Sequence, residues 1–145
     1  MTVCRVRHSA RGVRLLMIYV AIFVILIIFS YIAILLLYPV NPLEMALQLM
    51  FPILFFGNMA FMLSTITRSG NGTAVFMIII GIALMFLGKP DSFWNVLLNP
   101  FRVPDNVHPI IWEGILIKNR IFLLSASLVW MMVGLLYLQK RERFV

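Results

Sequence analysis

Charged side chains are scarce in this 145-residue chain, and that scarcity limits its class before any motif is considered. Only 12% of the residues are charged, whereas 63% are hydrophobic and the mean hydropathy is +1.04. Soluble globular domains carry about 25% charged residues and about 45–50% apolar ones. The composition therefore excludes an ordinary water-soluble domain and predicts an all-α, polytopic membrane protein. Its long, continuous apolar runs also exclude a barrel, whose strands alternate in hydrophobicity.

Residues that carry chemistry are equally few. Cys4 stands alone, so there is no internal disulfide and no cysteine-based metal site. His8 and His108 fall on opposite predicted sides of the membrane, which argues against a shared metal ion. No pair of acids falls inside a predicted span, so the usual signature of a proton relay is missing. We expect a non-catalytic chain without a metal or cofactor site.

One short polar interruption, Thr67-Arg68-Ser69-Gly70-Asn71-Gly72, organises what is present. Apolar runs of nearly membrane-spanning length flank it on both sides, and a helical span needs about 20 residues. An arginine in mid-membrane costs about 2.5–3.5 kcal/mol, so Arg68 marks a return to water. The glycines and the asparagine suit a tight turn with positive φ. The sequence predicts a membrane hairpin with a charged tip.

Counting outward from this hairpin gives four transmembrane helices. A basic N-terminus, residues 1–14, precedes a membrane domain over 15–138, and a polar tail follows over 139–145. Proline after the first apolar run ends that helix, because proline removes a backbone donor. The spans are expected at about 15–38, 47–66, 73–87 and 121–138.

The segment 89–119 differs from the spans in containing prolines, charges and aromatic residues. Aromatic side chains of this kind favour the headgroup interface of a membrane. Ser92 to Leu98 could form a short interfacial helix. Ile110 to Ile117 is apolar but too short to cross. We expect an outer cap that lies on the membrane and partly dips into it.

Basic residues set the orientation. With both termini inside, eight bases lie inside and four outside, which favours cytoplasmic termini. The formal charge of +7 is explained by this flanking placement, so nucleic acid is not an expected partner, whereas membrane lipids are.

Polar residues inside the spans are the remaining candidates for function. Asn58 could line a pathway, although a hydrogen bond to a neighbouring helix is the more common role of such a residue. The candidate interface or pathway residues are Gly57, Asn58 and Ser64.

The order of features resembles the C-terminal half of the ABC-2 type permeases, the membrane subunits of bacterial ABC exporters. The resemblance rests on Leu63 to Gly70 before a short turn, on Leu98-Asn99-Pro100-Phe101 in the outer segment, on Lys118-Asn119-Arg120 before the last span, and on Lys140 to Phe144. It implies a six-span domain in the plasma (inner) membrane, with outer re-entrant helices between its last two spans. Only four spans fit here.

The resemblance further implies a cytoplasmic ATPase subunit and a second permease chain as partners. It places Arg68, Ser69 and Gly70 on the ATPase side, and Asn99, Pro100 and Phe101 in the outer cap. The expected function is that of a permease subunit forming part of an export pathway. The alternative is a small structural or regulatory subunit of a multi-subunit membrane complex. The substrate stays open.

Overall fold

Helices make up the regular structure of this chain. The computed structural model describes residues 2–36, 41–89 and 91–142, with side chains for 13–36, 41–89 and 91–140. Within these residues there is no strand, and the four helices are α1 (Thr2–Leu36), α2 (Pro42–Thr67), α3 (Gly70–Leu87) and α4 (Pro109–Glu142). Each contains a segment long and apolar enough to cross a membrane: Val13–Leu36, Pro42–Thr67, Gly70–Leu87 and Pro109–Lys140. The predicted four-span, all-α integral membrane protein is confirmed.

The chain divides into two compact units, Met1–Met50 and Phe51–Val145, which we call the N-terminal and C-terminal units. The boundary lies inside α2, one residue before Pro52, and the helix stays continuous through that proline. In the N-terminal unit, α1 starts at Thr2, so the basic segment and the first span belong to one helix. The predicted end of this span at Tyr38 lies outside the described residues.

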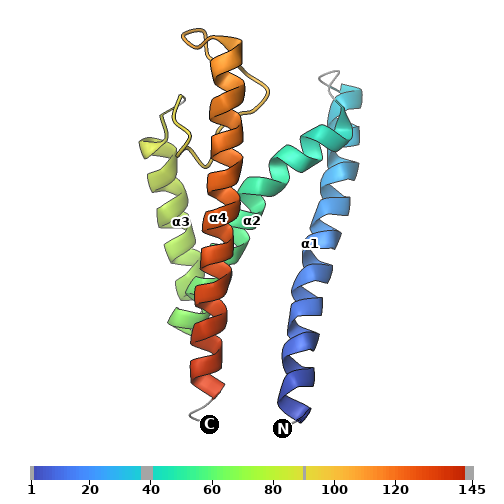
Figure 1. Cartoon of the computed structure of the whole chain (residues 1–145), viewed down its shortest axis with the longest axis vertical. Helices are drawn as coiled ribbons and strands as arrows, with labels where there is room; N and C mark the ends of the chain where they lie inside the picture. The colour runs from blue at the N-terminus through green and yellow to red at the C-terminus, as the bar shows by residue number, and fades with distance from the viewer. Residues whose placement is uncertain (1, 37–40, 90, 143–145) are drawn as a thin grey trace. The chain divides into compact units, whose positions relative to one another are not determined.

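The C-terminal unit consists of the later part of α2, the helices α3 and α4, and the loop between them (Figure 1). Its core is small and contains the buried side chains of Phe55, Met59, Val96 and Leu123. Val96 belongs to the loop, so the loop contributes directly to the core. The unit has two ends, which we call the turn end, at Arg68, and the loop end, at residues 88–108.

The turn end is tighter than the sequence suggested. Arg68, not a glycine, adopts the left-handed conformation, with φ of 56°, and no described glycine has a positive φ. Gly70 and Gly72 instead lie in the first turn of α3, because Ser69 caps that helix in an extended conformation. The Ser69 Oγ accepts a hydrogen bond from the Gly72 N–H at 3.2 Å, as an N-cap residue does. The cap position therefore decides where the strained residue falls.

At the loop end, the structure differs from the predicted cap. Ser92 to Leu98 does not form a helix but a series of separate turns, in which the N–H groups of Ser92, Asn95 and Leu98 donate to Lys89, Ser92 and Asn95 respectively. Side chains in this stretch bond the local backbone: Ser92 Oγ accepts from the Trp94 N–H, and Asn95 Oδ1 accepts from the Leu97 N–H. Such bonds compete with helix formation. The described part of the loop, 88–89 and 91–108, contains no re-entrant helix either.

Helix α4 also starts earlier than expected. It begins at Pro109, so residues 109–119 of the predicted cap 89–119 are helical and continuous with the last span, which was predicted to start at 121. Proline suits the first position of a helix, where its missing N–H has no partner to lose. At about 1.5 Å per residue, the 34 residues of α4 extend about 50 Å, longer than a hydrocarbon core of about 30 Å.

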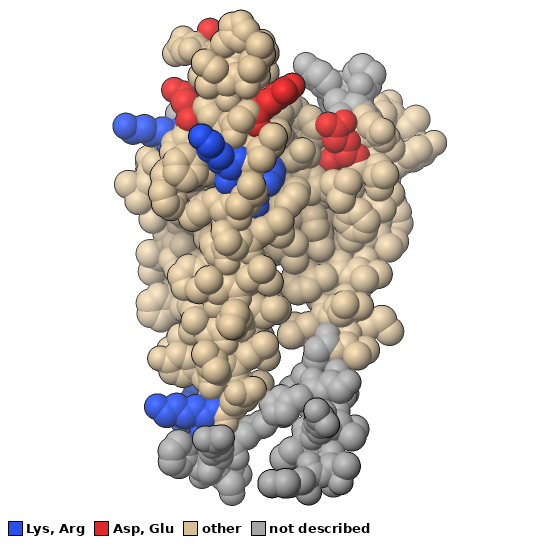
Figure 2. Space-filling view, in the orientation of Figure 1, with Lys and Arg blue, Asp and Glu red and all other residues tan. Residues whose placement is uncertain are grey.

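Charge separates the two ends of the C-terminal unit. On the face shown in Figure 2, acidic side chains of this unit gather at the loop end together with basic ones, and uncharged residues cover the middle. The loop end and the start of α4 contain Lys89, Asp91, Arg102, Asp105, Glu113, Lys118 and Arg120. The turn end carries Arg68.

Candidate functional site

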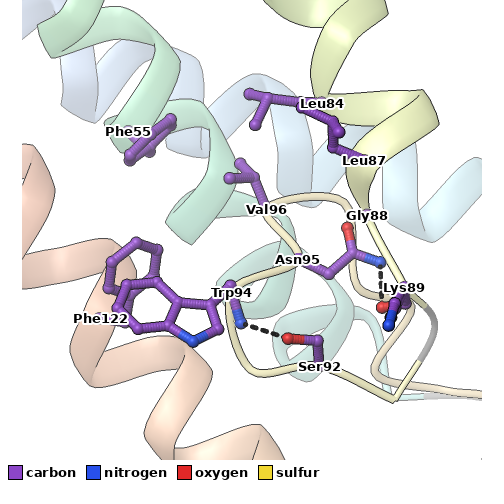
Figure 3. Close-up of a pocket in the computed structure, with 10 residues that line it drawn as sticks. All are labelled: Phe55, Leu84, Leu87, Gly88, Lys89, Ser92, Trp94, Asn95, Val96 and Phe122. Carbon is purple, nitrogen blue, oxygen red and sulfur yellow. Dashed lines mark hydrogen bonds between the residues drawn. The ribbon is translucent and has the colours of Figure 1, made fainter.

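The loop end contains a pocket of about 450 Å³, on which helices and loop converge (Figure 3). A volume of this size falls within the range of about 300–1,000 Å³ that is usual for small-molecule sites. Apolar side chains from all three helices and the loop form most of its wall. The lining residues are Phe55, Leu84, Leu87, Gly88, Lys89, Ser92, Trp94, Asn95, Val96 and Phe122.

A buried amide on α4 holds the loop that forms one wall of this pocket. The Asn119 side chain is fully buried, and its Nδ2 donates to the carbonyl oxygens of Phe93 at 2.7 Å and Asn95 at 2.9 Å. Asn95 in turn donates from its own Nδ2 to the Lys89 carbonyl at 3.2 Å. The loop is therefore tied to the helix 24 to 26 residues further along the chain, and its pocket wall is fixed by polar contacts beneath it.

Aromatic rings form the side of the pocket next to α4. Trp94 packs edge-on against Phe122, with 4.8 Å between the ring centroids, and it lies 4.6 Å from Phe93. The Trp94 side chain is 60% exposed, so one of its faces remains open. Aromatic rings with a polar edge are typical of the zone between lipid headgroups and tails.

Glycine is required at the end of α3, where the chain passes into the pocket wall. Gly88 ends α3, and its N–H donates to the Leu84 carbonyl at 3.0 Å. A Cβ at this position would lie 2.7 Å from Asn95 Oδ1 and 2.9 Å from Leu84 O. This close approach brings the Asn95 side chain against the end of α3, and it places Lys89 at the pocket rim.

The predicted cap residues lie beside this pocket rather than in it. Asn99 is exposed and lines a second, more polar pocket of about 430 Å³ together with Arg102 and Asp105. Its Oδ1 accepts a hydrogen bond from the Phe101 N–H at 3.0 Å, which closes a local turn over Pro100. The side chain of Phe101 is exposed.

The three candidate interface residues of α2 do not act together. Asn58 is only 5% exposed, and its Nδ2 donates to Ser127 Oγ of α4 at 2.7 Å. Ser127 donates to the Leu54 carbonyl at 3.2 Å, so Asn58 takes part in a bond between α2 and α4, which is the interhelical role. Gly57 is half-buried and Ser64 is exposed. Because these two are seven residues apart, they share a face that Asn58 does not.

The candidate ATPase-side turn is exposed and held by hydroxyl groups. Arg68, Ser69 and Gly70 are all exposed. Thr67 donates to the Leu63 carbonyl at 2.9 Å, and Thr73 donates to the Ser69 carbonyl at 2.8 Å. The two threonine hydroxyls lie 3.0 Å apart across the turn. These bonds fix the backbone that carries Arg68.

Arg120 is a buried cation next to Asn119, and the sequence analysis named it only as part of the stretch before the last span. Its side chain is 8% exposed, and its guanidinium carbon lies 5.1 Å from the centroid of the Phe51 ring. Nη1 donates to Asn119 Oδ1 at 3.3 Å, whereas Nε and Nη2 have no hydrogen-bond partner in the described structure. Charges buried in membrane helices are costly and usually functional.

Asn119, Ser127 and the pocket wall were also missed. Asn119 lay at the end of the predicted cap and was named only in the Lys118-Asn119-Arg120 stretch that precedes the last predicted span. The available signal was the absence of proline between Pro109 and the last span, which would have extended the helix and placed Asn119 inside it.

The chain matches no protein-family model, no curated protein and no solved structure.

Proposed function

We propose that this chain is a membrane subunit of an ABC exporter, non-catalytic itself and driven by a separate ATPase subunit. The observation that carries the proposal is the turn end of the C-terminal unit. It presents one exposed arginine on a backbone fixed by hydroxyl bonds, and a contact for a partner protein needs such a rigid surface. The resemblance to ABC-2 type permeases supports the same assignment, because it places this turn on the ATPase side.

The proposed orientation puts both termini and the turn end in the cytoplasm of a bacterial cell, with the loop end outside. The distribution of basic residues supports it, since eight of them fall on the termini and the turn. In this arrangement the loop end is the outer cap of the unit, and Arg68 faces the compartment that contains ATP.

A second membrane chain completes the proposed pathway. The C-terminal unit buries few side chains, and most large apolar residues of α3 are exposed. A polytopic unit of this size does not enclose a wide channel, so the substrate path is proposed at an interface between two membrane domains. Gly57 and Ser64 remain candidates for that interface because neither of them takes part in the bond between Asn58 and α4.

The alternative is a structural or regulatory subunit of a larger membrane complex. One observation favours it: the described part of the loop end lacks the re-entrant helices that the permease resemblance implies. A complex built only from integral membrane chains would need no exposed turn for an ATPase.

Purification of the full chain from its native host in nanodiscs, followed by mass spectrometry of the bound proteins, tests the proposal. We expect a stoichiometric ATPase subunit to copurify with the unmodified chain and with the control Arg102→Glu. This control makes the same charge reversal as Arg68→Glu, but at the loop end. Arg68→Glu should release the ATPase. Recovery with integral membrane partners alone would support the structural alternative, and a stable oligomer without any ATPase would contradict the exporter proposal.

A further inference from the structure

The pocket at the loop end has the composition of a lipid site. Its wall is formed mainly by Phe55, Leu84, Leu87, Val96 and Phe122, and Lys89 is the single charged side chain among the described residues that line it. The polar groups of the loop are already engaged: Ser92 and Asn95 bond the loop backbone. A ligand therefore meets an apolar interior with one cation at the rim.

We propose that this pocket holds an acyl chain of an anionic phospholipid whose phosphate pairs with the Lys89 ammonium group. The proposal is independent of the exporter function, because a lipid can occupy the pocket whether or not an ATPase drives the chain.

The position of the pocket along the membrane supports a lipid rather than a soluble ligand. Leu84 and Leu87 belong to the last turn of α3, and Lys89 follows two residues later, where the candidate span has ended. A lysine at the end of a span reaches toward the headgroups. The apolar part of the lining therefore lies at the depth of the lipid tails, and Lys89 lies at the depth of the headgroups, as the parts of a phospholipid do.

Lys89 is available for such a phosphate. Its side chain is exposed, and the described structure gives it no ion pair. Asp91, the nearest acid in the sequence, lines the second pocket and not this one. The Lys89 carbonyl accepts the Asn95 hydrogen bond, which fixes the backbone below the ammonium group.

Charge, not the acyl chain, must supply the selectivity. A lipid tail already lies in hydrocarbon, so moving it into the pocket gains no hydrophobic free energy. A single basic residue near a membrane surface attracts anionic lipid by an amount that corresponds to about a fivefold preference. We therefore expect the pocket to prefer phosphatidylglycerol over phosphatidylcholine by about fivefold. This preference should weaken as the salt concentration is raised.

Quenching of Trp94 fluorescence by brominated lipids measures this preference directly. The full chain, with Trp112→Phe and Trp130→Phe so that Trp94 is the sole tryptophan, is reconstituted in vesicles of phosphatidylcholine and phosphatidylglycerol in which one lipid or the other is brominated. Retained phosphatidylglycerol is also counted by native mass spectrometry on the chain with all three tryptophans, in case the double replacement fails to fold.

Two variants, each with a matched control, test where the lipid binds. Lys89→Gln should abolish the preference, whereas Arg102→Gln, a loop cation outside this pocket, should keep it. Leu84→Phe fills the pocket and should abolish the preference although Lys89 remains, whereas Ile82→Phe on the same helix should not.

The proposal is overturned by equal quenching from both lipids, by a preference that survives Lys89→Gln, or by one that disappears equally in Arg102→Gln. A preference that survives Leu84→Phe would mean that headgroups adsorb at the surface while the pocket stays without an acyl chain. That outcome would also reject the site.

Discussion

The two ends of the C-terminal unit are built on different principles. At the turn end, the side-chain hydrogen bonds join residues at most six positions apart, from Leu63 to Thr73. At the loop end, Asn119 reaches backbone groups 24 and 26 residues away. The turn end is thus encoded in one short segment, and the loop end depends on α4. This difference explains why one end is a compact tip and the other contains pockets.

The largest effect is expected where the loop end is tied down. Asn119→Leu removes both bonds to the loop and leaves the Phe93 and Asn95 carbonyls without this donor. Unsatisfied buried groups cost about 1–3 kcal/mol each, so the two carbonyls together give an expected loss of about 2–6 kcal/mol of stability. Thermal unfolding in detergent measures the loss, and limited proteolysis should cut within residues 91–108.

The adjacent residue provides the control. Arg120→Met keeps a long side chain over Phe51 but removes a buried charge and the hydrogen bond from Nη1 to Asn119 Oδ1. In the described structure Arg120 has no acidic partner to offset the cost of desolvating its charge, and an apolar side chain of similar length avoids that cost. We expect unchanged or higher stability. If Arg120→Met destabilised the unit as much as Asn119→Leu, the loop would depend on the bond between Arg120 and Asn119 as well as on the two bonds from Asn119 to the loop.

Helices α2 and α4 approach closely near the turn end, and Gly134 tests this approach. A Cβ at Gly134 would lie 2.8 Å from the Phe61 ring and 3.3 Å from the Met62 Cα, so α2 and α4 approach closely here. Gly134→Ala should cost about 1–3 kcal/mol through overpacking. Gly114→Ala, in the same helix with no heavy atom within 4 Å of the new Cβ, should instead stabilise α4 by up to about 1 kcal/mol. Equal effects in the two variants would disprove the close approach.

Between the two ends, Asn58 and Ser127 link α2 to α4. A double-mutant cycle with Asn58→Leu and Ser127→Ala should give a coupling energy of about 0.6–1.7 kcal/mol, as measured for such bonds in membranes. If the chain is the proposed exporter subunit, transport should not change in Asn58→Leu, because the side chain is buried against α4. A transport defect in a normally assembled complex would return Asn58 to the substrate path.

The smallest effect is expected at Arg68. Its left-handed backbone conformation costs a non-glycine residue about 1–2 kcal/mol, part of which Arg68→Gly should relieve, raising stability by less than about 1 kcal/mol. Arg68→Ala removes the same charge but keeps the strain and should leave stability unchanged. If both variants behaved alike in thermal unfolding, the charge rather than the backbone would control the turn.

The contrast between the turn end and the loop end also explains which features could be predicted from the sequence. The hairpin, the number of spans and the position of Arg68 follow from apolar runs and one interruption, which are local signals. The sequence does not reveal which turn residue carries the positive φ, because that depends on Ser69 taking the cap. The pocket and its Asn119 anchor depend on pairing distant segments, and no local pattern encodes such pairing. The helix predicted over Ser92 to Leu98 was wrong for a related reason, since serine and asparagine side chains bond the local backbone there.

The most direct test of the account is the side of the membrane on which each end of the C-terminal unit lies. Cys4→Ser removes the native thiol, and single cysteines are then introduced by Gly70→Cys at the turn end and by Asn106→Cys at the loop end, both exposed positions. A membrane-impermeant maleimide added to intact spheroplasts should label the Asn106→Cys variant and should label the Gly70→Cys variant only after permeabilisation. Labelling of both variants from outside, or of the turn end alone, would contradict the proposed orientation and, with it, the contact of Arg68 with a cytoplasmic ATPase.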